Sequence, residues 1–199
     1  MTKAKILKIS TEEFSLLGYD GVSMNNLAKK LEINKATIYY HFKDKQTLYQ
    51  EVIISLMQKN REKEYELIAS TMAPKEKFRA LIDLIIQEFK ETPEIIAIIL
   101  REMANVGQNL QNDVMDHELK KDMDILNQII KQLPLKEKYK NIDISIVHSF
   151  IIGTITSYFS FQMSNIGNEI LVDLGKDKNR ILNYSSQMVS DILLDAICI

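Results

Sequence analysis

The segment SMNNLAKKLEINKATIYYHFKDKQTL, residues 23–48, decides the fold that the sequence predicts. Ser23 stands where a residue caps the start of a helix, and the apolar stripe of that helix consists of Leu27, Ala28 and Leu31. After a turn, Asn34 is a second N-cap before the helical segment KATIYYHF, residues 35–42, and Asp44 is a third before the helix that begins at Lys45. Two short capped helices with a tight turn between them indicate a helix-turn-helix, whose second helix enters the major groove of DNA.

The composition of the chain is typical of a soluble all-α protein. Its 199 residues are 46% hydrophobic and 26% charged, and no alternating apolar run is long enough to indicate a sheet. The single cysteine, Cys198, excludes an internal disulfide and fits a reducing cytoplasm. The most apolar segment, 142–161, is interrupted by Asp143, His148 and Gly153. We therefore expect it to be a buried helix and not a membrane span.

The charge of the chain is unevenly distributed, although the net value is only −2. Residues 1–50 contain eight lysines and five acidic side chains, whereas residues 51–199 contain 17 basic and 22 acidic ones. A mildly basic N-terminal region on an acidic remainder suits a protein that presents one end to a polyanion. The charge pattern therefore supports DNA binding without establishing it.

Helical periodicity continues along the chain and predicts about nine helices. The first covers residues 3–17 and ends at Gly18. Its expected inward face consists of Ile6, Ile9, Phe14 and Leu17. One long helix is expected from Lys45 to about Met72, with the charged stretch 59–64 on its solvated side; it would span roughly 40 Å and link two domains. The remaining helices are expected at 75–91, 94–104, 112–133, 142–165 and 179–197.

The two C-terminal helices carry more apolar surface than one helical body needs. The helix at 142–165 is apolar nearly all round and has a stripe of small residues along one face. We expect a symmetric homodimer through a four-helix interface, and burial of both helices inside a monomer is the alternative. The residues assigned to this interface are Ser149, Gly153, Ser157, Ser160, Met188 and Ile192.

The sequence resembles the tetracycline-repressor (TetR) family of transcriptional regulators over about residues 5–50. The resemblance is carried by the segment INKATIYYHF, residues 33–42, together with Phe14, Gly18, Ser23, Leu27, Ala28, Lys45 and Leu48. Glu32 stands where this family usually has a turn glycine, which costs about 1 kcal/mol if the residue needs a positive φ. Ala36 stands where glycine is common, a change that favours helix.

The predicted DNA-binding residues lie on and around the second helix of this motif. Helical geometry turns Ile38 and Phe42 inward and exposes Asn34, Lys35, Thr37 and Tyr39. Lys35 and Thr37 are suited to phosphates or base edges, and the Tyr39 ring to a thymine methyl group. The resemblance implies that Tyr40, His41 and Lys45 grip the phosphate backbone, and Ser23 completes the predicted set. Alternatively Tyr39, Tyr40 and His41 are core aromatics, but three consecutive helical residues span too wide an arc for all of them to be buried.

The resemblance also implies an effector mechanism. A small molecule enters the body, shifts the linker helix, spreads the two heads of the dimer and releases the operator. We accordingly predict a DNA-binding domain at residues 1–46 and an effector-binding and dimerisation domain at 47–199, with a hydrophobic or amphipathic effector. The side chains that could line its cavity, each of which also fits a plain core role, are Met57, Phe78, Phe89, Met103, Met123, Phe150 and Tyr158.

Other candidate sites are weaker. Asp113 and His117 lie one helical turn apart and could hold a metal or polar ligand, but a solvated polar face is the simpler interpretation. His148 is expected to be a satisfied buried histidine. We predict no catalytic residue, metal or cofactor, because the sequence has no Gly-rich phosphate loop, no Ser/His/Asp pattern and no clustered metal ligands.

The leading hypothesis is a cytoplasmic homodimeric repressor that a small effector releases from a palindromic double-stranded DNA operator. Two alternatives remain open. The chain could be an activator, or a DNA-organising regulator, that needs no small molecule. It could also be a helical adaptor whose helix-turn-helix binds protein.

Overall fold

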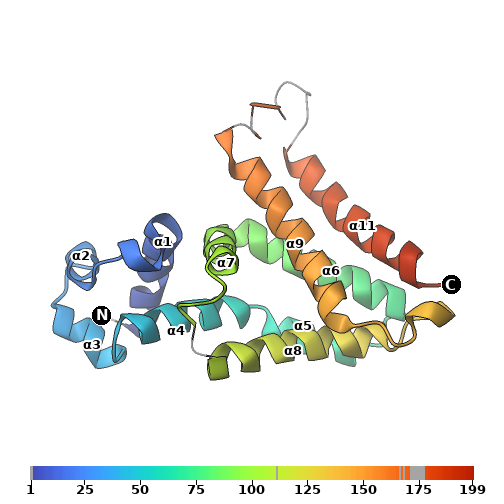
Figure 1. Cartoon of the computed structure of the whole chain (residues 1–199), viewed down its shortest axis with the longest axis horizontal. Helices are drawn as coiled ribbons and strands as arrows, with labels where there is room; N and C mark the ends of the chain where they lie inside the picture. The colour runs from blue at the N-terminus through green and yellow to red at the C-terminus, as the bar shows by residue number, and fades with distance from the viewer. Residues whose placement is uncertain (1, 111, 166, 168, 171–177) are drawn as a thin grey trace. The chain divides into compact units, whose positions relative to one another are not determined.

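The computed structural model describes residues 2–110, 112–165, 167, 169–170 and 178–199, without the side chains of 112–115 and 178–183. The fold is all-α, as the sequence predicts (Figure 1). Its helices are α1 (Lys3–Gly21), α2 (Met24–Lys30), α3 (Lys35–His41), α4 (Lys45–Met57), α5 (Arg61–Ala69), α6 (Pro74–Glu91), α7 (Glu94–Ala104), α8 (Asn112–Ile130), the 3₁₀ helix η1 (Glu137–Tyr139), α9 (Ile144–Met163) and α11 (Lys178–Ile197).

The chain forms two compact units. The first unit comprises residues 1–59 and 92–118, and the second comprises residues 60–91 and 119–199. The DNA-binding domain predicted at residues 1–46 lies inside the first unit. That unit is larger than the prediction because both α4 and α7 pack against α1.

The head of the first unit, formed by α1, α2, α3 and the start of α4, encloses a small apolar core. Its fully buried side chains are Ile6, Phe14, Leu27, Ile38, Phe42 and Leu48. Leu17 does not belong to this core, contrary to the prediction, and is exposed. The buried stripe of α1 runs instead through Ser10, Phe14 and Gly18, whose small members allow α7 to approach α1 closely.

Two of the three predicted helix caps form in the head. Asn34 Oδ1 accepts a hydrogen bond from the Ala36 amide at 2.8 Å, and Asp44 Oδ1 accepts one from the Thr47 amide at 2.7 Å. Ser23 occupies the N-cap position of α2, but among the described residues its hydroxyl receives no capping bond. The predicted capping bond of Ser23 is therefore wrong, and its exposed hydroxyl is available to a partner.

The helix predicted from residue 45 to residue 72 is two helices. Residues 58–60 separate α4 from α5. Just after the break, Arg61 is buried and pairs with Glu64 at 3.1 Å and with Asp122 at 2.5 Å. The charged stretch 59–64 is therefore partly built into the second unit, whereas the sequence placed it on the solvated side of one continuous helix.

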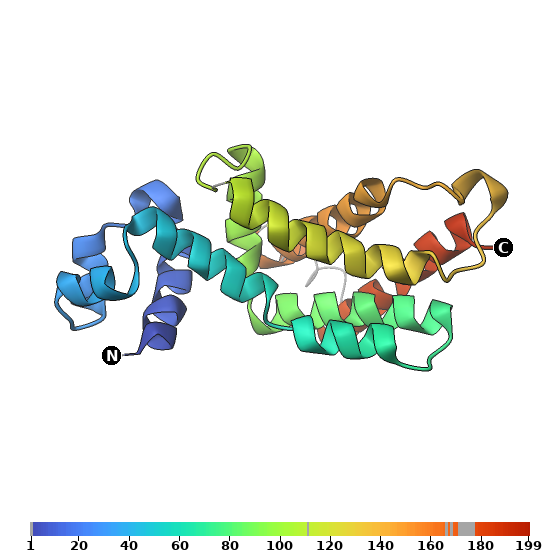
Figure 2. The same ribbon diagram turned by 90° about the horizontal axis from the view of Figure 1, so that it is seen from below.

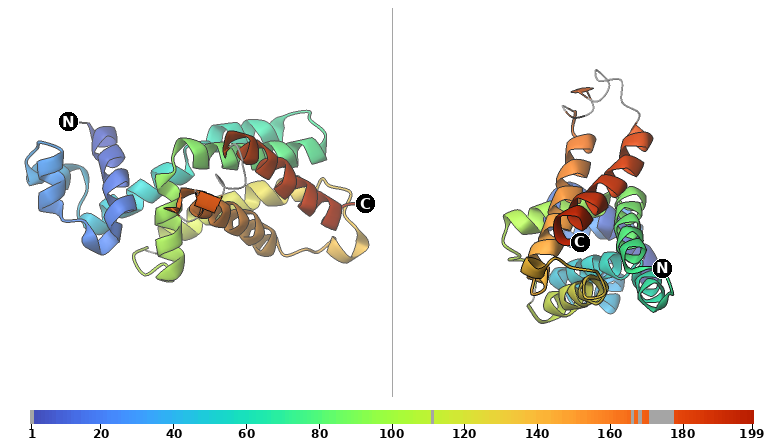
Figure 3. Two further views of the ribbon diagram at one scale, coloured as in Figure 1. Left: turned by 90° about the horizontal axis from the view of Figure 1, so that it is seen from above. Right: turned by 90° about the vertical axis from the view of Figure 1, so that its right-hand side faces the viewer.

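The second unit packs its helices around α6. Figure 2 shows α5 and α6 as antiparallel neighbours, and both α9 and α11 contact α6 (Figure 3). Phe78 and Ile82 of α6 are fully buried, and the Phe89 ring lies 5.6 Å from the Phe159 ring of α9. An antiparallel bridge between Leu135 and Cys198 joins the end of the chain to the segment after α8.

Helix α9 is the only helix in the described part of the chain that is long and apolar enough to cross a membrane by length and composition alone. The mean hydropathy of its most apolar window is 1.4, and 28% of that window is buried. Because α9 packs on α6 through Phe159, it is a partly buried core helix, as its polar interruptions predict.

Candidate nucleic-acid interface

Helix α3 presents a surface of rings and short polar side chains to solvent. Ile38 and Phe42 hold it to the head from inside. Tyr40 is 85% exposed and Tyr39 is 40% exposed, while His41 is half-buried. The alternative in which these three aromatic residues all belong to the core is therefore wrong, and α3 is free on the face that a recognition helix turns to DNA.

Two polar side chains at the start of α3, Asn34 and Lys35, are already ordered by contacts within the protein. Asn34 uses Oδ1 to cap the helix, so its side-chain amide remains the group that is available to DNA. The Lys35 ammonium lies 5.4 Å from the centroid of the Tyr39 ring, a cation–π contact on the exposed side. Together with Thr37, these groups offer donors and a flat apolar ring, which suits phosphates and base edges.

Lys45 lies at the first residue of α4, behind the Asp44 cap. Its ammonium sits 4.5 Å from the centroid of the Tyr19 ring and donates to the Asp20 carbonyl oxygen at 3.4 Å. Burial lowers the pKa of Lys45, and the nearby Asp20 carboxylate partly opposes this effect. The predicted phosphate-binding lysine is therefore held against the end of α1.

A layer of aromatic rings supports Tyr19 from inside. The Tyr19 ring stacks on Phe14 at 6.4 Å with an interplanar angle of 10°, and it lies 5.2 Å from the Tyr49 ring. The Tyr49 hydroxyl donates to Glu102 Oε1 of α7 at 2.7 Å. Burial, followed by this hydrogen bond to Glu102, raises the pKa of Tyr49 far above its ordinary value, so the hydroxyl stays protonated and keeps donating.

Arg101 joins α7 to the end of α1. Its guanidinium donates to the carbonyl oxygens of Phe14 at 3.1 Å and Leu16 at 3.0 Å, and also to that of Ser15. These carbonyls lose their helical partners where α1 kinks at Gly18, which has a φ of 71°. A Cβ at Gly18 would lie only 3.4 Å from Arg101 Cδ. A side chain from α7 thus caps the α1 turn that carries Tyr19.

Four residues of this support are not among the predicted site residues: Tyr19, Tyr49, Arg101 and Glu102. In the sequence, Arg101 and Glu102 form a charged pair near the end of the apolar segment 94–104. The available indication was that charged pair, because two adjacent charges at the end of an apolar helix need partners when the helix is buried. Which carbonyls and hydroxyls supply the partners depends on long-range packing that a single sequence does not contain.

The predicted effector-pocket residues do not gather around one described cavity. Phe78 and Phe89 are packed in the core, whereas Met103 is 61% exposed and Phe150 is 42% exposed. The other three, Met57, Met123 and Tyr158, are half-buried. Their assignment to an effector pocket stays a prediction.

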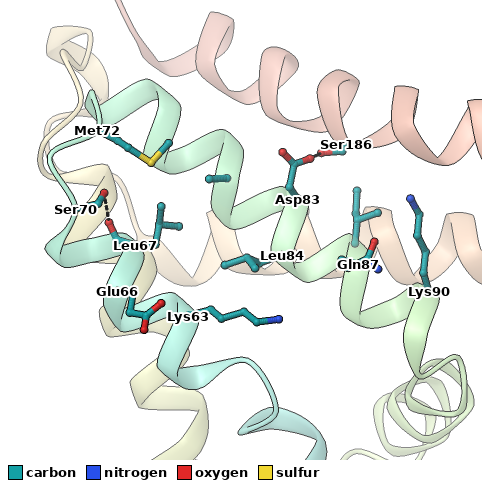
Figure 4. A pocket seen from close by; sticks show the side chains of 12 residues that line it. Lys63, Glu66, Leu67, Ser70, Met72, Asp83, Leu84, Gln87, Lys90 and Ser186 are labelled. Atoms are coloured by element: carbon teal, nitrogen blue, oxygen red, sulfur yellow. Dashed lines mark hydrogen bonds between the residues drawn. The ribbon is translucent and has the colours of Figure 1, made fainter.

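A groove of about 630 Å³ lies in the second unit, between α5, α6 and α11 (Figure 4). Leu67, Leu84 and Ile86 contribute apolar surface, and Lys63, Glu66 and Asp83 contribute charge. Asp83 accepts a hydrogen bond from the Ser186 hydroxyl across the groove. The groove contains none of the seven residues predicted for the effector pocket.

The residues predicted for the dimer interface lie on two apolar, solvent-exposed helix faces. On α9, Ser149 and Ser157 are exposed and Gly153 and Ser160 are half-buried. On α11, Met188 is 49% exposed and Ile192 is 46% exposed. Further exposed apolar residues of these helices are Ile146, Phe150, Phe161, Met163 and Tyr184.

The weaker candidate sites receive little support. His117 is exposed, and the side chain of Asp113, its predicted neighbour in a site, lies outside the described residues. His148 is half-buried, and burial lowers its pKa. Across the residues that the structure describes, no three His, Cys, Asp or Glu side chains group as they would around a metal ion.

Comparison with known proteins supports the assignment of the head. The family of bacterial regulatory proteins named tetR matches residues 6–52. The HTH-type transcriptional regulator YhgD of Bacillus subtilis (strain 168) is 30% identical over 114 residues, 57% of this chain and 59% of YhgD. The biofilm operon icaADBC HTH-type negative transcriptional regulator IcaR of Staphylococcus aureus (strain Newman) is 39% identical over 51 residues, 26% of this chain and 27% of IcaR. The chain thus aligns with less than two thirds of the length of each curated relative.

Similarity to solved structures covers almost the whole chain. The transcriptional regulator FadR of Bacillus subtilis, solved in complex with stearoyl-CoA, superposes with a TM-score of 0.70 at 20% identity. The superposition covers 96% of this chain and 97% of FadR. At this identity the similarity is one of fold, and it includes the helices that follow the head.

Proposed function

Because this chain belongs to the TetR family of helix-turn-helix transcriptional regulators, we propose that it is a homodimeric repressor released from a palindromic operator by a small, mainly hydrophobic effector. The family consists of regulatory proteins, so the expectation that the chain is not an enzyme is confirmed. A role on the chromosome also assigns the chain to the cytoplasm.

The observation that carries the proposal is the surface of α3 and the adjacent start of α4. Tyr39 and Tyr40 leave their rings in water, and at the start of α4 the Lys45 ammonium is ordered against the Tyr19 ring. Rings and ammonium groups are what a recognition helix needs for thymine methyl groups and phosphates. We assign Lys35, Thr37 and Tyr39 to base edges and Tyr40, His41 and Lys45 to the backbone, with Ser23 and Asn34 beside them.

Dimerisation is supported by the exposed apolar faces of α9 and α11. A monomer in water would leave Phe150, Phe161, Met188 and Ile192 between 41% and 49% exposed, which is unfavourable by roughly 25 cal/mol per Å² of exposed apolar surface. A second copy would cover the same faces symmetrically and set two recognition helices on two half-sites, as a palindromic operator requires.

The effector part of the proposal draws on two similar proteins. The fold is shared with FadR, which was solved with stearoyl-CoA, and IcaR is described as a negative regulator. We propose a hydrophobic effector that binds the DNA-free arrangement better than the DNA-bound one, since only a difference in affinity shifts the population. The seven separate side chains predicted above for the effector pocket, which include Met57 and Tyr158, remain the proposed lining of the effector cavity.

Footprinting of the region upstream of the gene tests the DNA-binding proposal. We expect protection of an inverted repeat with half-sites about one helical turn apart or somewhat more. Replacing Lys45 with Ala should weaken binding to every sequence and reduce the salt slope by about one unit. Lys131→Ala, which removes an exposed lysine of the second unit, is the matched control and should leave the slope unchanged.

Each alternative has its own outcome in these assays. A helical adaptor would protect no DNA in any promoter. An activator or DNA-organising regulator would bind DNA without being released by any compound in a thermal-shift screen of hydrophobic ligands. No specific observation in the structure favours either alternative over the repressor.

A further inference from the structure

We propose that Tyr19 is a positioning residue for DNA binding, because its ring holds the Lys45 ammonium where that group meets a phosphate. The inference rests on the proposed function and adds a residue that does not itself belong to the DNA-facing surface of α3. Tyr19 is half-buried at the end of α1, whereas the residues proposed to touch DNA lie on α3 and at the start of α4.

The geometry around Lys45 fixes the position of its charge. The ammonium lies 4.5 Å from the Tyr19 ring centroid, within the range of a cation–π contact, and donates to the carbonyl oxygen of the next residue, Asp20, at 3.4 Å. An ammonium has three donors. One is used on Asp20, so two remain for the oxygens of a phosphate.

The ring itself is fixed in place. Phe14 stacks on one side of it and Tyr49 lies 5.2 Å from it. Tyr49 is in turn fixed by its hydrogen bond to Glu102. The backbone that carries Tyr19 is held by Arg101, which binds three carbonyl oxygens at the end of α1. Because these contacts hold the Tyr19 ring in place, the ring determines the position of the Lys45 ammonium before DNA binds.

Ordering a lysine before it binds should matter for affinity. A solvated lysine side chain loses much rotamer freedom when it contacts a phosphate, and that loss opposes binding. Lys45 has lost part of this freedom in the free protein, so it binds with a smaller entropic penalty. Lys43, two residues earlier and exposed, provides a natural comparison, because it carries the same charge and is not stacked on Tyr19.

A double-mutant cycle tests whether Tyr19 acts through Lys45. The full-length protein and an operator duplex identified by footprinting are used, and affinity is measured by fluorescence anisotropy at fixed salt. We expect Tyr19→Leu to weaken binding about fivefold and Tyr19→Phe to change it less than about twofold, since Phe keeps the ring. In a Lys45→Ala background, Tyr19→Leu should cost less than about 1.5-fold, whereas in a Lys43→Ala background the loss should stay near fivefold.

The outcomes separate this inference from the proposed function. Equal losses in the Lys45→Ala and Lys43→Ala backgrounds would overturn the positioning role and leave the repressor proposal intact. Absence of operator binding by the unmodified protein would overturn both.

A measurement that needs no Tyr19 variant covers the case in which Tyr19→Leu fails to fold. In NMR spectra of the ¹³C-lysine-labelled protein, the ring current of Tyr19 should shift the Lys45 Cε protons upfield, and Lys45→Ala identifies the signal. Lys45 Cε protons at the position of an ordinary exposed lysine would overturn the inference.

Discussion

Helix α3 and the pair α9/α11 both expose aromatic side chains, yet their surroundings differ. The exposed rings of α3 belong to tyrosines, which carry hydroxyl groups, and Lys35 lies against the Tyr39 ring, so water solvates that surface well. The faces of α9 and α11 combine Phe150, Phe161, Met188 and Ile192 with small residues. In the proposed function the first surface stays in water until DNA binds, whereas the second is covered permanently by a second copy of the chain. Exposure alone therefore does not distinguish a conditional binding surface from an obligate one.

The largest expected effect comes from placing a charge on the proposed obligate surface. Ile192→Asp would bury an unpaired carboxylate in the dimer, at a cost of several kcal/mol, and should raise the dimer dissociation constant more than about 100-fold. Sedimentation equilibrium would report a monomer. Operator binding should fall with it, because one recognition helix binds only one half-site.

The control for this variant is Tyr65→Asp on α5, where the native side chain is 48% exposed, close to the 46% of Ile192. We expect Tyr65→Asp to remain dimeric. A monomeric wild-type protein, or dimers of both variants, would show that the α9/α11 surface is not an interface and would remove the contrast with α3.

The next effect concerns the stability of the head. A stable head allows the α3 rings to remain exposed without a partner. Arg101→Ala removes three hydrogen bonds from a guanidinium to the carbonyls at the end of α1. We expect a loss of about 2 kcal/mol in the free energy of unfolding, measured by urea denaturation. Arg79→Ala is the matched control, because its ion pair with Asp191 joins side chains that are 47% and 38% exposed and should contribute less than about 1 kcal/mol. Equal losses would show that the Arg101 contacts do not hold α1.

A smaller effect is expected at the turn between α2 and α3. Glu32 has a φ of 56°, so Glu32→Gly should stabilise the protein by about 0.5 to 1 kcal/mol, once the greater freedom of glycine in the unfolded chain is included. Glu32→Ala serves as the control, because alanine meets the same backbone strain and should give no gain. A gain with alanine would mean that the side chain of Glu32, and not its backbone conformation, is unfavourable.

The features that the sequence predicted are local ones, and they lie in the head that carries α3. Capping chemistry is local, so the Asn34 and Asp44 caps followed from short stretches of sequence. The family resemblance marked residue 32 as a turn-glycine position, and Glu32 has a positive φ there. The width of a helix face predicted that Tyr39, Tyr40 and His41 are not all buried, and this is confirmed. These features all belong to the head.

Features that depend on contacts between distant segments were not predicted. The break between α4 and α5 contains neither proline nor glycine, and it coincides with the burial of Arg61 against Asp122, a residue far along the chain. Likewise, the buried stripe of α1 contains Ser10 and Gly18 and leaves Leu17 exposed, and α7 packs against α1. Apolar periodicity favours the larger side chain at such positions, whereas close helix packing favours the smaller one.

The smallest expected effect distinguishes the buried side of α9 from its exposed face. Burial lowers the pKa of His148, although the Asp122 carboxylate partly opposes this shift. The neutral ring is thus favoured in the folded protein, so stability should be present above the ordinary histidine pKa and decline as the pH falls toward the lowered value. The free energy of unfolding should therefore decrease from pH 7.5 to 5.5, and His148→Gln should flatten that part of the profile. His117→Gln, at an exposed histidine, is the control and should still show the decrease that His148 causes. If His148→Gln retains the full decrease, then the histidine is solvated in solution and α9 is less buried on that side than the structure indicates.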